Sequence, residues 1–333
     1  MIFDPNQTRF DNEPQHKIWQ YGIHLVPLSV SLADVVDEQI REGCRQVYDC
    51  TMEILEDMYE HAETFSVYPP KWYASAYLEW AVTGQRPMKK HSDEYARFLE
   101  KLSAHGFTYD QSQGLWTNRR YPLLGETLAP LRVLAKKRKQ NLGGYFDRLD
   151  FRLFAPRIQL TDADLLRPLS DKNRAYALDM QQHALSLDMK VERTPYCFRY
   201  SYKKLYSLEL LNHPFGIRVI YRLDNGKHVR DQFERFLSVA EEQKDAEEMI
   251  RYIHGGIMVC DSCAGKKRPD ERCGQWKQIH GARWLVSMCR PAVGKYRRGV
   301  QNTDFLDSDI QMLKRLLDVR VEQVDQYLLD RAE

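Results

Sequence analysis

The chain has 333 residues with a formal net charge of +2, and 43% of its residues are hydrophobic. This length suits two domains or one large one, and the apolar content is enough for a substantial core. The near-neutral charge excludes a protein that binds polyanions with its whole surface, and no run approaches the roughly 18 apolar residues of a membrane-spanning helix.

The first residues, MIFDPNQTRFDNEP, are polar and lack the basic and apolar regions of a secretory signal. The chain has an odd number of cysteines, 7, and part of them are spaced like metal ligands. This combination favours a reducing compartment over a disulfide framework, with Cys44, Cys50 and Cys197 as isolated thiols. We therefore expect a cytoplasmic protein without a membrane partner.

The first half is predicted to be mainly helical. Apolar residues recur at steps of three and four between residues 32 and 64, which predicts a long amphipathic helix capped near Ser31 and Asp34. Further helices are expected over 71–82, 93–105 and 126–139. A short hairpin is expected around Gln113 and Gly114, whereas 145–154 fits a strand and a helix equally well.

The second half is predicted to contain both helices and strands. Ser170 is predicted to cap a helix over 171–188, and aromatic residues then alternate with small or polar ones from Tyr196 to Tyr202, the period of a strand with one buried face. Strands over 205–211 and 217–223 complete an antiparallel meander joined by short turns. The remaining predicted helices cover 229–240, 244–256 and, after a cap at Thr303 or Asp304, the chain to about residue 330.

These elements predict an α+β fold. We expect a mainly helical domain over 1–157 and an α+β domain over 158–303, in which helices pack on a small antiparallel sheet. The helix over 304–333 is expected to pack on the body of the protein.

The sharpest chemical signal is a cluster of four cysteines, Cys260, Cys263, Cys273 and Cys289, within a predicted module over 254–298. A Cys-x2-Cys pair directs two sulfurs toward one point, and tetrahedral zinc needs two further ligands within reach of the loop. The intervening segment is polar and rich in turn residues, so we expect a metal to replace a hydrophobic core there. Four thiolates fill every position of the ion, which predicts a structural Zn²⁺.

Other interpretations of the cluster remain open. The four cysteines could be unrelated buried thiols, a redox dithiol at Cys260 and Cys263, or the ligands of an iron–sulfur cluster. His280, or less well His254, could replace one of the cysteine ligands. Zinc is favoured over a redox pair because such pairs lie in a βαβ unit, which the sequence does not predict.

Basic residues outnumber acidic ones throughout this module, and aromatic residues are interleaved with them. Such a surface could contact nucleic acid, with the phosphates held by Lys266, Lys267, Arg268, Arg297 and Arg298. The alternative is that the positive charge offsets bound thiolates and keeps the module soluble, and we favour this second interpretation.

Catalytic motifs are absent from the sequence: it has no G-x-S-x-G, no Walker A loop, no G-x-G-x-x-G and no H-E-x-x-H. Asp147 and Asp150 are expected to pair with neighbouring arginines or solvent. We therefore expect a non-enzymatic ligand-binding or regulatory protein, with its ligand between the halves or on the tyrosine-rich strand face. An enzyme of unrecognised type remains an alternative, with His183, His213 or Glu192 near the meander as titrating groups.

Overall fold

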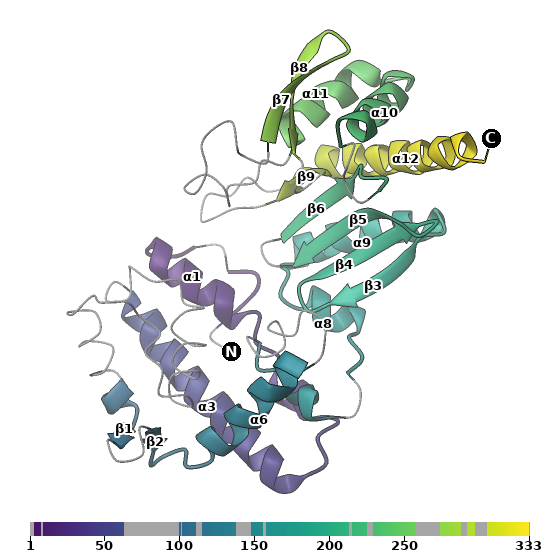
Figure 1. Cartoon of the computed structure of the whole chain (residues 1–333). Coiled ribbons are helices and arrows are strands. Elements are labelled where there is room, and N and C mark those ends of the chain that lie inside the picture. Colours follow the sequence, from purple (N-terminus) through teal and green to yellow (C-terminus); the bar gives the residue numbers. More distant parts are fainter. Residues whose placement is uncertain are drawn as a thin grey trace. The chain divides into compact units, whose positions relative to one another are not determined.

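The computed structural model describes residues 3–7, 9–62, 100, 102–110, 115–137, 148–155, 158–212, 215–224, 229–257, 274–287, 292–296 and 305–332 (Figure 1). The chain divides into two compact units, Met1–Leu160 and Thr161–Glu333, and each has a hydrophobic core of its own. Helices combine with small antiparallel sheets, so the prediction of an α+β fold is confirmed.

The first unit is mainly helical among its described residues. Its elements are α1 (Glu13–Gly22), α2 (Leu28–Ser31), α3 (Glu38–Glu60), β1 (Phe107–Asp110), β2 (Leu115–Asn118), α6 (Leu124–Lys137) and the 3-10 helix η2 (Phe151–Phe154). β1 and β2 form an antiparallel hairpin, as predicted from the turn residues between them. The predicted helix over 71–82 lies outside the described residues.

The long helix α3 begins later than the sequence predicts. Asp37 is its N-cap, and the Asp37 side chain accepts a hydrogen bond of 3.0 Å from the backbone N–H of Ile40. Ser31 cannot serve this purpose because its hydroxyl donates to the Leu28 carbonyl inside the separate short helix α2. The buried face of α3 has the expected spacing and consists of Cys44, Val47, Cys50, Ile54, Leu55 and Met58.

Helices α3 and α6 cross at a glycine. A Cβ at Gly43 would overlap the Oγ1 of Thr127, so the two helices approach as closely as the missing side chain allows. One turn further along α3, the Gln46 Oε1 accepts a 2.9 Å hydrogen bond from the N–H of Leu123, just before α6 begins. The two helices therefore run antiparallel through this contact.

The turn before η2 is fixed by a buried ion pair. Asp150 caps η2 and accepts bonds of 2.8 Å from both the Nε and the Nη2 of Arg152, with both side chains buried. This pairing agrees with the structural interpretation of Asp150 in the sequence. Asp147 lies outside the described residues.

The second unit contains a five-stranded sheet and the helices that cover it. Its elements are α8 (Asp162–Leu166), α9 (Asp171–Ser186), β3 (Lys190–Thr194), β4 (Cys197–Tyr202), β5 (Leu205–Asn212), β6 (Phe215–Ile220), α10 (Val229–Glu241), α11 (Ala246–Gly256), β7 (Gly274–Ile279), β8 (Ala282–Ser287), β9 (Ala292–Tyr296) and α12 (Asp307–Asp330). The predicted N-cap of α9, Ser170, is confirmed, whereas α12 begins after Leu306 and not at Thr303 or Asp304.

The sheet has the order β3-β4-β5-β6-β9, and every neighbouring pair is antiparallel. The predicted meander of β4, β5 and β6 is confirmed. Figure 1 shows α9 and α12 on one face of these strands, and α12 packs on β5 and β6. Phe198 and Tyr200 lie in the core beneath these helices at 2% and 0% exposure. This part of the tyrosine-rich face therefore belongs to the core, and a ligand site on that face stays a prediction from sequence.

The hairpin β7–β8 is anchored by apolar side chains. Ile279, Trp284 and Val286 are all buried, and the Trp284 ring meets Phe233 of α10 edge-on at 5.5 Å. β9 then joins the main sheet beside β6. The polar segment around Gly265 to Asp270, where a metal is expected to replace a hydrophobic core, lies outside the described residues.

Helix α12 carries a fully buried cation. The Arg320 guanidinium donates to the Tyr206 carbonyl at 3.1 Å, to the Arg222 carbonyl and to the Gln323 Oε1, and its side chain has 0% exposure. Burial lowers the pKa of Arg320 below its ordinary value, because desolvation disfavours the charged guanidinium. Arg320 thus ties α12 to the chain on either side of β6.

Within the described residues, no helix combines the length and the apolar character needed to cross a membrane.

Candidate functional site

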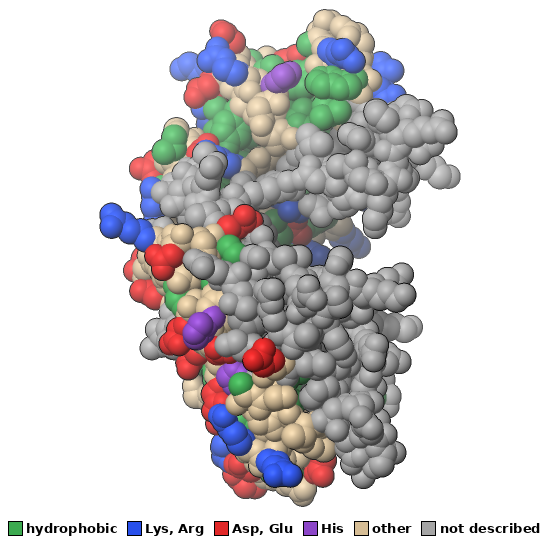
Figure 2. All heavy atoms as spheres, turned by 90° about the vertical axis from the view of Figure 1, so that its left-hand side faces the viewer, with side chains coloured by type: hydrophobic (Ala, Val, Ile, Leu, Met, Phe, Trp, Pro, Cys, Tyr) green, Lys and Arg blue, Asp and Glu red, His purple; other side chains and the backbone are tan. Residues whose placement is uncertain are grey.

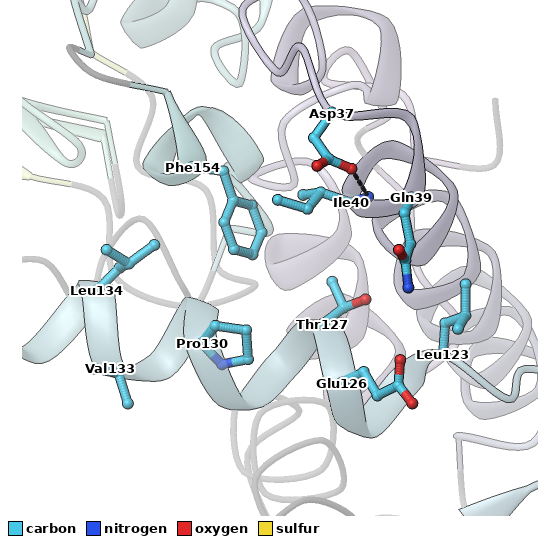
Figure 3. A pocket seen from close by; sticks show the side chains of 10 residues that line it. All are labelled: Asp37, Gln39, Ile40, Leu123, Glu126, Thr127, Pro130, Val133, Leu134 and Phe154. Carbon is cyan, nitrogen blue, oxygen red and sulfur yellow. Dashed lines mark hydrogen bonds between the residues drawn. The ribbon is translucent and has the colours of Figure 1, made fainter.

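A pocket of about 530 Å³ lies in the first unit beside the crossing of α3 and α6 (Figure 3). Ten residues line it: Asp37, Gln39, Ile40, Leu123, Glu126, Thr127, Pro130, Val133, Leu134 and Phe154. Its volume falls in the range of small-molecule sites, which is about 300–1,000 Å³. The pocket is a candidate ligand site because its walls come from three rigid elements, α3, α6 and η2.

The pocket wall is mostly apolar. Ile40 points across the pocket toward Phe154, and Pro130 and Thr127 lie along α6 beneath them (Figure 3). Pro130 sits inside α6 and has no N–H to offer the Glu126 carbonyl one turn earlier, which loosens the helix at the pocket. Proline within a predicted helix was the one sequence signal that could have indicated this place.

The rim of the pocket is acidic. Asp37 Oδ1 accepts from Ile40, but its Oδ2 has no hydrogen-bond donor among the residues that the structure describes. The Glu126 carboxylate and the Gln39 amide likewise have no hydrogen-bond or ion-pair partner among the residues that the structure describes. None of the ten lining residues is basic. The pocket therefore combines an apolar interior with two carboxylates and one amide facing solvent.

The four predicted zinc ligands, Cys260, Cys263, Cys273 and Cys289, all lie outside the described residues. The structure describes the chain up to Ile257 and again from Gly274 to Ser287. In the sequence, Gly274 directly follows Cys273 and Ser287 precedes Cys289 by two positions, and Gly274 and Ser287 pair with each other in the β7–β8 hairpin.

His280 is at the opposite end of that hairpin. It occupies the turn between β7 and β8 with φ +47°, and its Nδ1 lies 2.7 Å from the Glu241 carboxylate. Six strand residues at about 3.3 Å each separate this turn from the other end of the hairpin, where Gly274 pairs with Ser287. The role of His280 as a replacement for Cys273 or Cys289 stays a prediction from sequence, because the four cysteines lie outside the described residues. His254 lies near the end of α11 with its ring 5.3 Å from that of Trp284.

The described residues contain no group of three or more histidines, cysteines or acidic residues that could hold a metal ion. The predicted nucleic-acid contacts, Lys266, Lys267, Arg268, Arg297 and Arg298, lie outside the described residues, so this role stays a prediction from sequence. Of the described basic residues in the module, Lys295 is paired with Asp309 at 2.5 Å. Lys295 therefore forms an ion pair within the protein.

The titrating groups considered for an enzyme do not form one site among the described residues. His183 of α9 lies 2.8 Å from Asp318 of α12, on the helical side of the sheet. Glu192 lies on the other face of β3, because its neighbour Val191 packs on the core. His213 lies outside the described residues.

That second face of the sheet carries a row of alternating charges. Glu192, Arg199, Glu209 and Arg218 are consecutive cross-strand partners from β3 to β6. Arg218 lies 3.0 Å from Glu209, and Arg199 lies 3.8 Å from it. The charges satisfy one another, which is typical of a stabilising ladder and gives no preference for a charged ligand.

Figure 2 shows one face of the molecule, with histidine and acidic side chains next to one another in its lower part. Among the described residues, a second polar cluster lies on α3 and joins His105, Asp57 and Glu53. His105 Nε2 is 3.1 Å from Asp57 Oδ2, and Tyr121 donates to Glu53 at 2.5 Å. Arg120 pairs with the same Glu53. Because these groups are paired with one another, the cluster is best explained as a link between α3 and the residues that follow β2.

No protein-family model matches the sequence, and no match was found among curated proteins or among solved structures. A functional assignment therefore has to come from the residues of this chain.

Proposed function

We propose that this protein is a non-enzymatic ligand-binding or regulatory protein whose ligand occupies the pocket between α3, α6 and η2. The observation that carries the proposal is the pocket itself: about 530 Å³, apolar walls and a few polar groups at its rim. Asp37 is used as a helix cap, and neither it nor Glu126 has a basic or nucleophilic partner in the pocket lining. Such a set of residues supports binding over catalysis.

The test compares ligand-induced stabilisation in two matched variants. Ile40 and Ile250 are both half-buried isoleucines on helices, but only Ile40 lines the pocket. Ile40→Trp places a larger ring into the pocket, and Ile250→Trp adds the same volume to α11. A small-molecule fragment library is screened by thermal denaturation with wild type and both variants. Fragments that raise the Tm of wild type and of Ile250→Trp, but not of Ile40→Trp, support the proposal, because binding stabilises only the state that contains the site.

The same screen can reject the proposal. If no fragment stabilises the wild type, or if every stabilising fragment acts equally on Ile40→Trp, the pocket is not the binding site. A purified protein that turns over a defined small molecule would contradict the non-enzymatic part.

We also propose that Cys260, Cys263, Cys273 and Cys289 hold one structural Zn²⁺. The pairing of Gly274 with Ser287 supports this, since these two residues are close neighbours of Cys273 and Cys289 in the sequence and lie together in the hairpin. Thiolate ligands match the preference of zinc. In small zinc modules such binding contributes roughly 10–16 kcal/mol of apparent free energy to folding.

Metal analysis tests the zinc proposal. Protein purified without added metal is expected to contain about one zinc per chain, and Cys273→Ser or Cys289→Ser to lose it. Cys197→Ser is the control, because Cys197 is a buried thiol beside Thr194 in the sheet. Zinc-free wild-type protein that remains fully folded would contradict the proposal, and a coloured preparation would indicate iron–sulfur instead.

A further inference from the structure

The charges around the α3–α6 pocket point to a class of ligand. Apolar walls formed by Ile40, Leu134 and Phe154 favour a hydrocarbon or aromatic body. The ionisable groups at the rim are both acidic, Asp37 from the start of α3 and Glu126 from the first turn of α6. Carboxylates without a cationic partner attract a cation, and the described lining residues include no basic side chain that would repel one.

The dipoles of α3 and α6 also contribute to the charge at the pocket rim. The N-terminus of α3 carries roughly half a positive charge and by itself favours an anion. Asp37 caps that terminus and offsets it with a full negative charge, and the C-terminal half of α6, which contributes Val133 and Leu134, brings the negative end of a second dipole. Glu38 does not alter the balance because it is paired with Arg45 at 2.9 Å. Among the side chains that the structure describes, the remaining charge at the rim is negative.

We propose that the pocket between α3, α6 and η2 binds a small apolar amine, with its hydrocarbon or aromatic body between Ile40 and Phe154 and its ammonium group at the acidic rim. This assignment depends on the proposed binding function of the pocket and specifies its ligand. The Gln39 amide can accept a further hydrogen bond from the ammonium group. A cationic head explains why the rim retains two carboxylates beside an otherwise apolar wall.

The experiment uses three ligands that share one body and differ only in the charge of the head: 4-phenylbutylamine, 4-phenylbutanol and 4-phenylbutanoate. Their dissociation constants for the full chain are measured by NMR titration at low and high salt. The amine is expected to bind at least threefold more tightly than the alcohol, and the carboxylate most weakly, because an exposed ion pair contributes little more than this. The advantage of the amine should shrink as salt is added, since both carboxylates are exposed.

Isosteric variants locate the effect. Asp37→Asn keeps an N-cap side chain, and Glu126→Gln keeps the shape of the rim, so both variants remove only charge. Each is expected to weaken the amine about threefold and to leave the alcohol unchanged. Glu60→Gln is the control, because Glu60 is exposed at the far end of the same helix, about 33 Å away by helical rise.

The outcomes separate the ligand class from the binding function. If the three ligands bind equally, or if the carboxylate binds best, the amine proposal is wrong while fragments sensitive to Ile40→Trp still support the pocket. If Glu60→Gln weakens the amine as much as Asp37→Asn does, the effect comes from overall charge and the proposal is wrong. If no ligand or fragment binds in a way that Ile40→Trp abolishes, both the ligand class and the proposed function are rejected.

Discussion

Gly43 of α3 lies directly against Thr127 of α6, and the space that a side chain would need at position 43 is filled by the Thr127 hydroxyl. Ile40 lies about one turn before Gly43, and Pro130 lies about one turn after Thr127. Both of these residues line the pocket. The glycine–threonine contact therefore defines the point from which the two helices form the pocket wall.

Replacing Gly43 with alanine should destabilise the protein even though alanine is the better helix former. Alanine gains about 1 kcal/mol of helix propensity, but overpacking a close contact costs about 1–3 kcal/mol. We expect Gly43→Ala to lower the free energy of unfolding by about 1 kcal/mol, as measured by urea denaturation.

The double variant Gly43→Ala/Thr127→Ala is the control for this explanation. Removing the Thr127 hydroxyl vacates the space that the new Cβ needs, so the double variant should recover the loss and be at least as stable as Thr127→Ala alone. Additive losses from the two substitutions would show that the contact does not limit the crossing.

The cap of α3 gives a second prediction. Asp37→Ala removes the acceptor for the Ile40 N–H and should cost about 1 kcal/mol, whereas Asp37→Asn should cost a few tenths at most. Thermal and urea denaturation of the two variants measure the difference. Equal stabilities of Asp37→Ala and Asp37→Asn would mean that the side-chain cap does not stabilise α3.

The buried guanidinium of Arg320 in α12 gives a third prediction. Arg320→Met leaves the Tyr206 and Arg222 carbonyls without their donor and should destabilise the second unit by about 2–4 kcal/mol. Lys314→Met on the same helix is the comparison, because its partner Asp179 is partly exposed and the pair should contribute less than about 1 kcal/mol. A loss at Arg320 no larger than that at Lys314 would contradict the anchoring role.

Thiol chemistry gives a fourth prediction. Burial raises the pKa of Cys44 and of Cys50 from 9.0 to about 12, so at pH 8 the thiolate fraction falls about a thousandfold. Alkylation by iodoacetamide, followed by peptide mass spectrometry, should label neither residue in the folded protein at pH 8. Their labelling rates should still rise steeply between pH 10 and pH 11, where a thiol with the ordinary pKa of 9.0 is already mostly ionised.

The sign of the linked stability effect follows from the same shift. Above about pH 9 the unfolded chain loses these thiol protons while the folded chain keeps them, so the two thiols lower the free energy of unfolding progressively toward pH 12. Rapid labelling of Cys44 or Cys50 in the folded protein at pH 8 would contradict both statements.

Local patterns predicted the elements that local chemistry determines. The alternation from Tyr196 to Tyr202 predicted β4, and Ser170 predicted the start of α9, because side-chain period and capping act within a few residues. The start of α3 was misplaced because Ser31 has the right chemistry for a cap but uses its hydroxyl within α2.

Long-range packing was not predictable in the same way. β9 pairs with β6 across a separation of about 75 residues, and nothing in its short sequence specifies that partner. Gly294 of β9 shows how closely the two strands pack, since a Cβ there would overlap the Ile217 carbonyl of β6. The pocket escaped prediction for the same reason, because its lining comes from residues 37–40, 123–134 and 154, which come together only in the folded chain.

The most direct test of the central claim follows the methyl groups of the pocket. In protein labelled with ¹³C at isoleucine, leucine and valine methyls, 4-phenylbutylamine should shift the resonances of Ile40, Leu123, Val133 and Leu134, which line the pocket. The exposed Leu178 and Leu185 of α9 serve as internal controls and should not move. Shifts confined to the pocket methyls are the predicted result, and unchanged pocket methyls at saturating ligand, or equal shifts at Leu178 and Leu185, would contradict a ligand site between α3, α6 and η2.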